Sequence, residues 1–263
     1  MKLPKQTPKE QEILKLHYQY RFLNSKQIQK FLHHKNKRRI NDWLPDLVKK
    51  EYLQRIYDPS TFSGKNQPAV YYLGNNGIRW LKTQDGYNSA VLQKLYRDKN
   101  RSDTFISTCQ LIADMCLDLK NQSNDKLSFD WATENEYTNP KSPLYFSGML
   151  SALHPHLIFT KKKNNKMSYY LLEIIPSTLP AYRVRKRIRT YLEFLTECEW
   201  IGHIKTAPEI LFVCETKELL IRSKRYTKKL LVESEEEHIN MCFAQKDEVQ
   251  KDGVTTEVWE DME

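Results

Sequence analysis

LNSKQIQKFLHHKNKRRINDWLPDLVKK, residues 23–50, predicts two consecutive helices separated by a short polar break. Asn24-Ser25 can cap the first of them, which places Ile28 and Phe31 on its inner side. After residues 33–36, apolar side chains recur at spacings of three and four, as expected for one buried face of a second helix: Ile40, Trp43, Leu44, Leu47 and Val48.

The opposite face of that second helix is predicted to be exposed and basic. A helix of 3.6 residues per turn points Arg38 and Asn41 away from the apolar stripe, and Lys37 and Arg39 flank them. Arg and Asn can make paired hydrogen bonds to guanine and adenine, respectively. We therefore predict that Arg38 and Asn41 read base edges and that Lys37 and Arg39 contact phosphates. Pro45 removes one backbone hydrogen bond and predicts a kink.

Helix and strand signals flank this pair. Thr7-Pro8-Lys9-Glu10 combines a capping hydroxyl, a proline in the first helical position and a glutamate three residues after the cap, and so predicts an earlier helix. Residues 52–57 and 69–73 read as strands joined by a turn-rich loop. Three helices followed by a hairpin are typical of a winged helix-turn-helix, which we predict over residues 1–82. Arg55 and Lys65 on the hairpin would contact phosphate.

Charge is distributed unevenly along the 263 residues. Residues 1–82 carry 17 Lys and Arg against 6 Asp and Glu, a net of +11, whereas the whole chain has +9. Residues 233–263 carry 2 Lys against 11 Asp and Glu, a net of −9. The basic N-terminal region favours double-stranded DNA as a partner, because the neutralisation of phosphates supplies much of the affinity of proteins for DNA. Two alternatives stay open: the charge serves only solubility, or the winged helix is an adaptor that binds protein.

Composition excludes several classes of protein. Hydrophobic residues make up 40% of the chain and charged residues 29%, which is typical of a folded globular protein. The longest apolar runs are far shorter than the roughly 20 residues that span a bilayer, so no membrane partner is expected. Five scattered cysteines without a CxxC pair argue against disulfides and structural zinc. The N-terminus shows no secretory signal, and we expect a cytoplasmic protein.

The second half of the chain predicts a mixed sheet. After a polar linker over residues 83–100 we expect a long helix around residues 105–119. Three strands follow, at residues 127–133, 156–160 and 168–175. A helix from Ala181 to Cys198 and a last strand at residues 209–214 complete the order. This order is that of the restriction-endonuclease-like core, which we assign to residues 101–232. Residues 233–263 form an acidic C-terminal extension, whose short apolar segments at residues 239–243 and 254–259 read as late strands added to the sheet. The predicted fold class is therefore α+β or α/β.

Two phrases in this region carry a family resemblance. Residues 154–159 read HPHLIF, and residues 169–194 read YYLLEIIPSTLPAYRVRKRIRTYLEF. Together with the predicted winged helix that precedes them, these segments resemble the replication-relaxation family of plasmid and mobile-element proteins of Gram-positive bacteria. The similarity spans roughly residues 7–215. It implies a winged helix joined to a nuclease-like domain, acting in replication or DNA relaxation of a plasmid, phage or integrative element.

The resemblance also implies a nuclease-like site, which here is degenerate. Nuclease-like folds carry Pro-Asp at the second strand and Glu-x-Lys on the third, and the matching positions read Pro155-His156 and Glu173-x-Ile175. One carboxylate is a poor ligand set for Mg²⁺. We therefore predict no metal site and no cofactor, with Glu173 as the residual catalytic candidate. In the alternative of a metal-dependent nuclease or relaxase, Mg²⁺ or Mn²⁺ would bind at Glu173, and Asp114 or Asp118 could add a ligand.

Two further groups have open interpretations. His154 and His156 would alternate onto one strand face and could bind a transition metal, but hydrogen-bonded or exposed histidines are commoner. Arg183, Lys186 and Arg187 could form a second DNA surface or the solvated face of an amphipathic helix. We predict a non-catalytic, sequence-specific DNA-binding protein. It would bind a repeated site as a homodimer, with replication proteins as possible partners.

Overall fold

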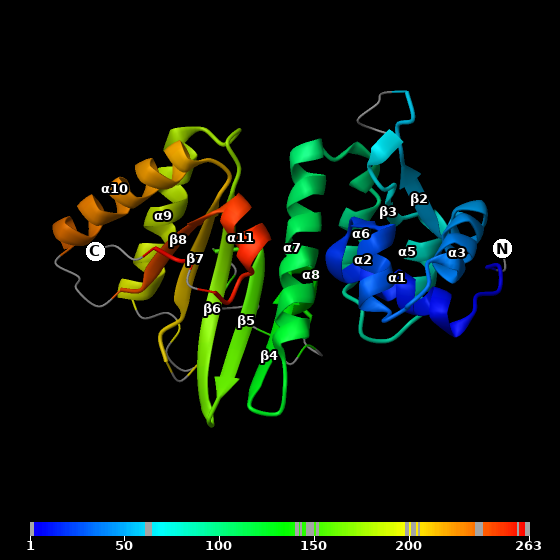
Figure 1. The fold of residues 1–263 in the computed structure, drawn as a ribbon, viewed down its shortest axis with the longest axis horizontal. Helices are drawn as coiled ribbons and strands as arrows, with labels where there is room; N and C mark the ends of the chain where they lie inside the picture. Colours follow the sequence, from blue (N-terminus) through cyan, green and yellow to red (C-terminus); the bar gives the residue numbers. More distant parts are fainter. Residues whose placement is uncertain are drawn as a thin grey trace. The chain divides into compact units, whose positions relative to one another are not determined.

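The computed structural model describes residues 3–60, 65–139, 142, 144–145, 150, 153–197, 200, 204, 206–234, 239–256 and 258–260. The chain divides into two compact units, Met1–Leu117 and Asp118–Glu263, and each is described by itself. Within the described residues, each unit has one β-sheet with helices (Figure 1). The predicted α+β class is confirmed.

The first unit combines a small antiparallel sheet with several helices. The sheet has the order β1-β3-β2, with Leu23 opposite Tyr71 and Leu53 opposite Leu73. Its elements are α1 (Pro8–Tyr20), β1 (Leu23–Asn24), α2 (Ser25–Phe31), α3 (Arg38–Lys49), β2 (Leu53–Ile56), β3 (Val70–Leu73), α5 (Asn75–Lys82), α6 (Ser89–Leu95), η1 (Asp98–Asn100) and α7 (Asp103–Gln122), of which α7 extends past the end of the unit.

Both predicted helix starts are confirmed by their hydrogen bonds. At α1 the Thr7 hydroxyl accepts from the backbone of Glu10 at 3.3 Å, and the Glu10 carboxylate accepts from the backbone of Thr7 at 2.6 Å. At α2 the Asn24 side-chain oxygen accepts from Lys26 N and Gln27 N, both at 3.0 Å. These reciprocal bonds satisfy backbone groups that a helix end leaves without partners.

The stretch predicted as a linker, residues 83–100, is folded. It contains α6, whose Val91, Leu92 and Leu95 are buried at helical spacing. Asp98 is 2% exposed and forms ion pairs with Arg21 and Arg101. This stretch therefore belongs to the first unit, because its apolar face and its buried carboxylate need partners there.

The second unit is built on a five-stranded mixed sheet of order β4-β5-β6-β7-β8. The pairs β4–β5 and β5–β6 are antiparallel, whereas β6–β7 and β7–β8 are parallel and are connected through α9 and α10. The elements are β4 (Leu127–Thr133), α8 (Glu134–Tyr137), β5 (Leu157–Lys163), β6 (Lys166–Ile175), α9 (Ala181–Thr196), β7 (Glu209–Cys214), α10 (Lys217–Ser234), β8 (Met241–Gln245) and α11 (Lys246–Asp252).

The predicted C-terminal extension is part of this sheet. β8 pairs with β7, with Ile210 opposite Met241, and α11 follows it within the second unit. Within the predicted extension, residues 235–238, 257 and 261–263 lie outside the described residues. So does Cys198, the predicted last residue of the helix that forms α9.

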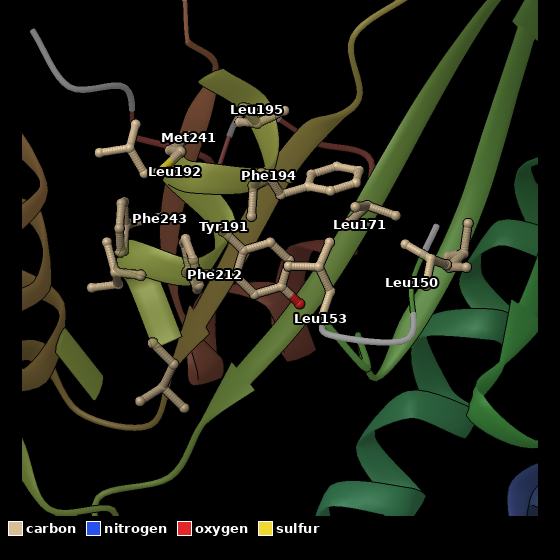
Figure 2. Close-up of a cluster of buried hydrophobic side chains, with 14 of the residues drawn as sticks. Leu150, Leu153, Leu171, Tyr191, Leu192, Phe194, Leu195, Phe212, Met241 and Phe243 are labelled. Carbon is tan, nitrogen blue, oxygen red and sulfur yellow. The ribbon is translucent and has the colours of Figure 1, made fainter. Parts of the chain in front are cut away.

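The core of the second unit fixes which face of α9 is exposed. Figure 2 shows Tyr191, Leu192 and Leu195 of α9 beside Phe212 of β7 and Phe243 of β8. The Tyr191 and Phe212 rings meet edge-on with centroids 5.4 Å apart, and Phe212 stacks on Phe243 at 4.9 Å. Aromatic pairs of this kind add to the free energy gained by burial.

Among the helices of the described residues, none combines the length and the apolar character that a membrane-spanning helix needs.

Candidate nucleic-acid interface and the Glu173 cluster

The apolar side of α3 is packed into the first unit. Ile40, Leu44 and Leu47 are at most 1% exposed. The half-buried ring of Trp43 meets the ring of His34 edge-on, with centroids 5.1 Å apart. Pro45 lies inside the helix, at an exposed position. Because three apolar side chains are locked in the core, the rotation of α3 about its axis is fixed.

The other side of α3 carries the predicted contact residues, and all of them are exposed. Lys37, Arg38, Arg39 and Asn41 are exposed side chains at the start of the helix. The three cations form no ion pair within the part of the chain that the structure describes. The Asn36 side-chain oxygen accepts from the backbone of Arg38 at 2.8 Å, so the first backbone donor of the helix is satisfied without a basic side chain. The basic groups therefore stay available to an external anion.

The charge at this helix start is unfavourable for the isolated protein. The N-terminus of a helix carries a partial positive charge, so each nearby cation costs about 0.3–1 kcal/mol. The first turn of α3 contains no acidic residue that could offset Lys37, Arg38 and Arg39. An anion bound at this end would be attracted by both the side chains and the helix dipole.

The connection that precedes α3 is held by side-chain bonds. The Gln29 side chain donates to the carbonyl oxygens of His34 at 2.8 Å and Lys35 at 3.4 Å. His33 has φ +54°, in the left-handed region, which turns the chain sharply after α2. The start of α3 is therefore positioned by α2 as well as by its own apolar face.

The hairpin carries the other two predicted phosphate contacts. Arg55 on β2 is exposed, and its guanidinium lies over the ring of the exposed Tyr57, 4.6 Å from the centroid. Lys65 is also exposed. Residues 61–64, in the predicted loop of the hairpin, lie outside the described residues. Both predicted hairpin cations are thus at the surface of the first unit.

Glu173 lies at the centre of a buried cluster in the second unit. The residue is 5% exposed on β6. Arg187 of α9 donates from Nε to Oε1 and from Nη2 to Oε2, both at 2.8 Å. The Tyr191 hydroxyl donates to Oε2 at 3.0 Å. This paired arrangement is the strongest geometry available between arginine and a carboxylate.

His156 and His154 complete the surroundings of this ion pair. His156 Nδ1 lies 3.2 Å from the backbone nitrogen of Ile174 and 3.4 Å from Glu173 Oε2. Arg187 Nη2 also donates to the carbonyl oxygen of His154 at 2.9 Å. Burial raises the pKa of Glu173, but the charges and hydrogen bonds of His156 and Arg187 outweigh it and lower the pKa to about 2. The carboxylate is therefore ionised at neutral pH and held by protein groups.

The cluster does not fit a divalent cation. Glu173 already accepts three hydrogen bonds, and a metal would have to displace the guanidinium of Arg187. In the described residues, no group of three His, Cys, Asp or Glu side chains is arranged to hold a metal. Asp114 instead accepts a hydrogen bond from Gln27 at 2.9 Å within the first unit. Oxygen ligands free of such partners are what Mg²⁺ needs.

Comparison with protein families gives a match to the replication-relaxation family over residues 14–210. This chain belongs to the replication-relaxation family. The match includes the exposed start of α3, the hairpin and the Glu173 cluster, and it ends within β7. No curated protein matches the chain. Membership points to a role in the replication of plasmids or mobile elements.

Two sequence-based expectations for this replication-relaxation protein need correction. Arg187 is one of the candidates for a second DNA surface or a solvated helix face, but its guanidinium is bound by Glu173 because a buried carboxylate needs a partner. His154 and His156 were predicted on one strand face, yet β5 begins only at Leu157. His154 is 53% exposed and lies 3.8 Å from the carboxylate of Glu134, away from the Glu173 contact made by His156.

The remaining members of the predicted second surface are exposed. Arg183 and Lys186 lie on the solvent side of α9. The sequence interpretation missed Tyr191 as a partner of Glu173, although it follows Arg187 by four residues and so shares its helix face. A basic and an aromatic residue at this spacing on the inner side of a helix were the available signal for a buried acid opposite them.

Proposed function

We propose that this replication-relaxation protein binds double-stranded DNA through its first unit, as a sequence-specific factor in replication or its control on a plasmid, phage or integrative element. The observation that carries the proposal is the start of α3. Its basic side chains are exposed and without ion pairs in the described part of the chain, and its apolar side is fixed in the core. A polyanion would satisfy these charges.

The proposed contacts follow the arrangement of a winged helix-turn-helix. α3 would enter the major groove with its N-terminal end, where Arg38 and Asn41 meet base edges. Lys37 and Arg39 would hold the adjacent phosphates. Arg55 and Lys65 on the hairpin, together, would contact the backbone beside that groove. One such module reads few base pairs, so we propose a homodimer on a repeated site.

The first experiment identifies the DNA. Purified full-length protein is mixed with fragmented plasmid and genomic DNA, and the retained fragments are sequenced. Enrichment of one repeated site is expected for a sequence-specific binder. Even recovery of all fragments would contradict sequence specificity, and recovery of none at low salt would contradict DNA binding itself.

The second experiment assigns the residues on the enriched site. Arg38→Ala is expected to cost about 1–3 kcal/mol and to relax the sequence preference. Arg39→Ala is expected to weaken all sequences alike and to lower the slope of log affinity against log salt by about 1. Lys94→Ala is the control, because Lys94 is an exposed cation on α6 outside the proposed interface. Unchanged affinity and preference in a folded Arg38→Ala protein would overturn the role of α3.

A further inference from the structure

A cavity of about 410 Å³ opens between α9 and α10 in the second unit. Ser177, just after β6, and Thr216, just after β7, both line it. The cavity therefore lies beyond the carboxyl ends of two parallel strands, which is where α/β sheets commonly bind ligands. Its volume is within the range of small-molecule sites, roughly 300–1,000 Å³.

Part of the cavity lining is apolar and belongs to the core. Val184 and Ile188 of α9 are at most 4% exposed, and Leu179 and Leu219 pack against the same core cluster. These side chains are held by neighbours on both helices and the sheet. The partly buried Leu179 and Leu219 thus present a preformed apolar surface to a ligand.

Three arginines make the cavity strongly basic. Arg185 of α9 and Arg222 and Arg225 of α10 line it, and all three are exposed. They form no ion pair with a carboxylate in the described residues. Glu218 is the one carboxylate among the described lining residues, and it interacts with Thr216 and, through its charge, with Arg222. Guanidinium groups match phosphate oxygens in paired geometry, so this set of charges favours a phosphate ligand.

The side chain of Tyr226, which also lines the cavity, favours a ligand that has a planar ring. The Tyr226 hydroxyl accepts from Arg189 at 3.2 Å, and its ring centroid lies 5.8 Å from the guanidinium carbon of Arg185. Tyr226 is therefore fixed beside the arginines, and an aromatic ring is a suitable neighbour for a nucleobase.

We propose that this cavity binds a nucleoside phosphate, with the phosphate among Arg185, Arg222 and Arg225 and the base and sugar against the apolar surface. The nucleotide is either free or the terminal nucleotide of a DNA strand, since both present the same phosphate and base. The family match ends at residue 210, so the whole contribution of α10 lies outside it. The inference does not depend on DNA binding by α3.

The test is a calorimetric titration of the full-length protein with each deoxynucleoside monophosphate. Saturable binding is expected, and the corresponding nucleoside and inorganic phosphate should each bind at least about tenfold more weakly, because each lacks one half of the contacts. A nucleoside that binds as tightly as its phosphate would overturn the role of the arginines. No binding by any nucleotide or phosphorylated strand would overturn the proposal.

Substitutions then place the ligand in this cavity. Arg222→Ala and Arg225→Ala are each expected to weaken nucleotide binding about tenfold or more, since a charged hydrogen bond is lost. Lys228→Ala on the same helix changes the protein charge equally, but Lys228 is exposed and does not line the cavity, so affinity should stay unchanged. All three residues are exposed, and the variants should fold. If both arginine variants bind like wild type, the cavity is not the site.

The source of the nucleotide is separated by competition. A short single-stranded oligonucleotide is prepared with and without a 5′-phosphate, and each form competes with the bound deoxynucleotide. Stronger competition by the phosphorylated strand than by the free nucleotide identifies a strand end as the ligand. The reverse order identifies the free nucleotide. Equal competition by both strand forms would show that the terminal phosphate is not recognised, and would contradict a strand-end site.

Discussion

The Arg187–Glu173 pair allows a quantitative test of what holds α9 against the sheet. In Arg187→Met, the Glu173 carboxylate would remain 5% exposed without its paired guanidinium. Removing one partner of a buried ion pair costs about 3–5 kcal/mol, because the other charge stays desolvated. We therefore expect the free energy of unfolding of the second unit to fall by about that amount.

The double variant distinguishes the net contribution of the ion pair to stability from the cost of leaving one buried charge without its partner. Glu173→Met with Arg187→Met removes both charges and keeps similar volumes, and such replacements of buried pairs are often neutral. Here the Tyr191 hydroxyl, on a residue that is 0% exposed, would lose its acceptor, at a cost of about 1–3 kcal/mol. Adding Tyr191→Phe removes that unsatisfied group. The triple variant should therefore be more stable than Arg187→Met alone.

Native-state hydrogen exchange of the β6 amides measures this free energy for the second unit by itself. Arg183→Met is the matched control, because Arg183 is an exposed arginine on the same helix, and its loss should change stability by no more than about 0.5 kcal/mol. A loss below about 1 kcal/mol in Arg187→Met would contradict a desolvated pair.

The same pair predicts the acid dependence. Because the pKa of Glu173 is lowered to about 2, its contribution to stability is full above the unfolded pKa of roughly 4.3 and is lost as the pH falls toward 2. Glu173→Gln should remove this part of the acid slope and leave stability less dependent on pH in that window. An unchanged slope would show that Glu173 is not held by charge.

Three other substitutions have defined outcomes. Lys37→Glu should raise the thermal stability of the first unit by about 0.3–1 kcal/mol through the helix dipole, measured by calorimetry, and weaken DNA binding in the same protein. Asn24→Ala should cost about 1 kcal/mol in urea unfolding, because two backbone donors of α2 lose their acceptor. Gly77→Ala should cost about 1–3 kcal/mol in the same assay, because a Cβ there would overlap the carbonyl oxygen of Tyr52.

Elements with local signals could be predicted from the sequence. The starts of α1 and α2 are each indicated by a four-residue motif, because a capping residue and its reciprocal partner lie three residues apart. The burial of α3 follows from spacings of three and four within one helix. α6 was missed because it has only seven residues, within a stretch that is mostly polar. Its burial depends on partners elsewhere in the first unit, which local spacing does not reveal.

The Glu173 cluster shows why the site was predicted only in part. Glu173 was identified as a candidate, but its partners come from a helix that follows the strand and from the segment before β5. Val184, Arg187, Ile188 and Tyr191 follow the same spacing of three and four, so Arg187 belongs to the inner face of α9. Arg187 therefore differs from the exposed arginines of α9, although the run of basic residues places it among them. The pairing itself is tertiary and cannot be read from one helix.

Basic residues in this protein therefore differ in function according to whether the fold already satisfies them. Arg187 is used internally, since two of its donors contact one carboxylate. Lys37, Arg38 and Arg39 lie at the positive end of a helix and have no ion-pair partner in the described residues. Their arrangement costs free energy in the unbound protein, and an anion bound at this helix end would lower that cost. The same distinction separates Arg187 from Arg185 on the cavity, although both lie on α9.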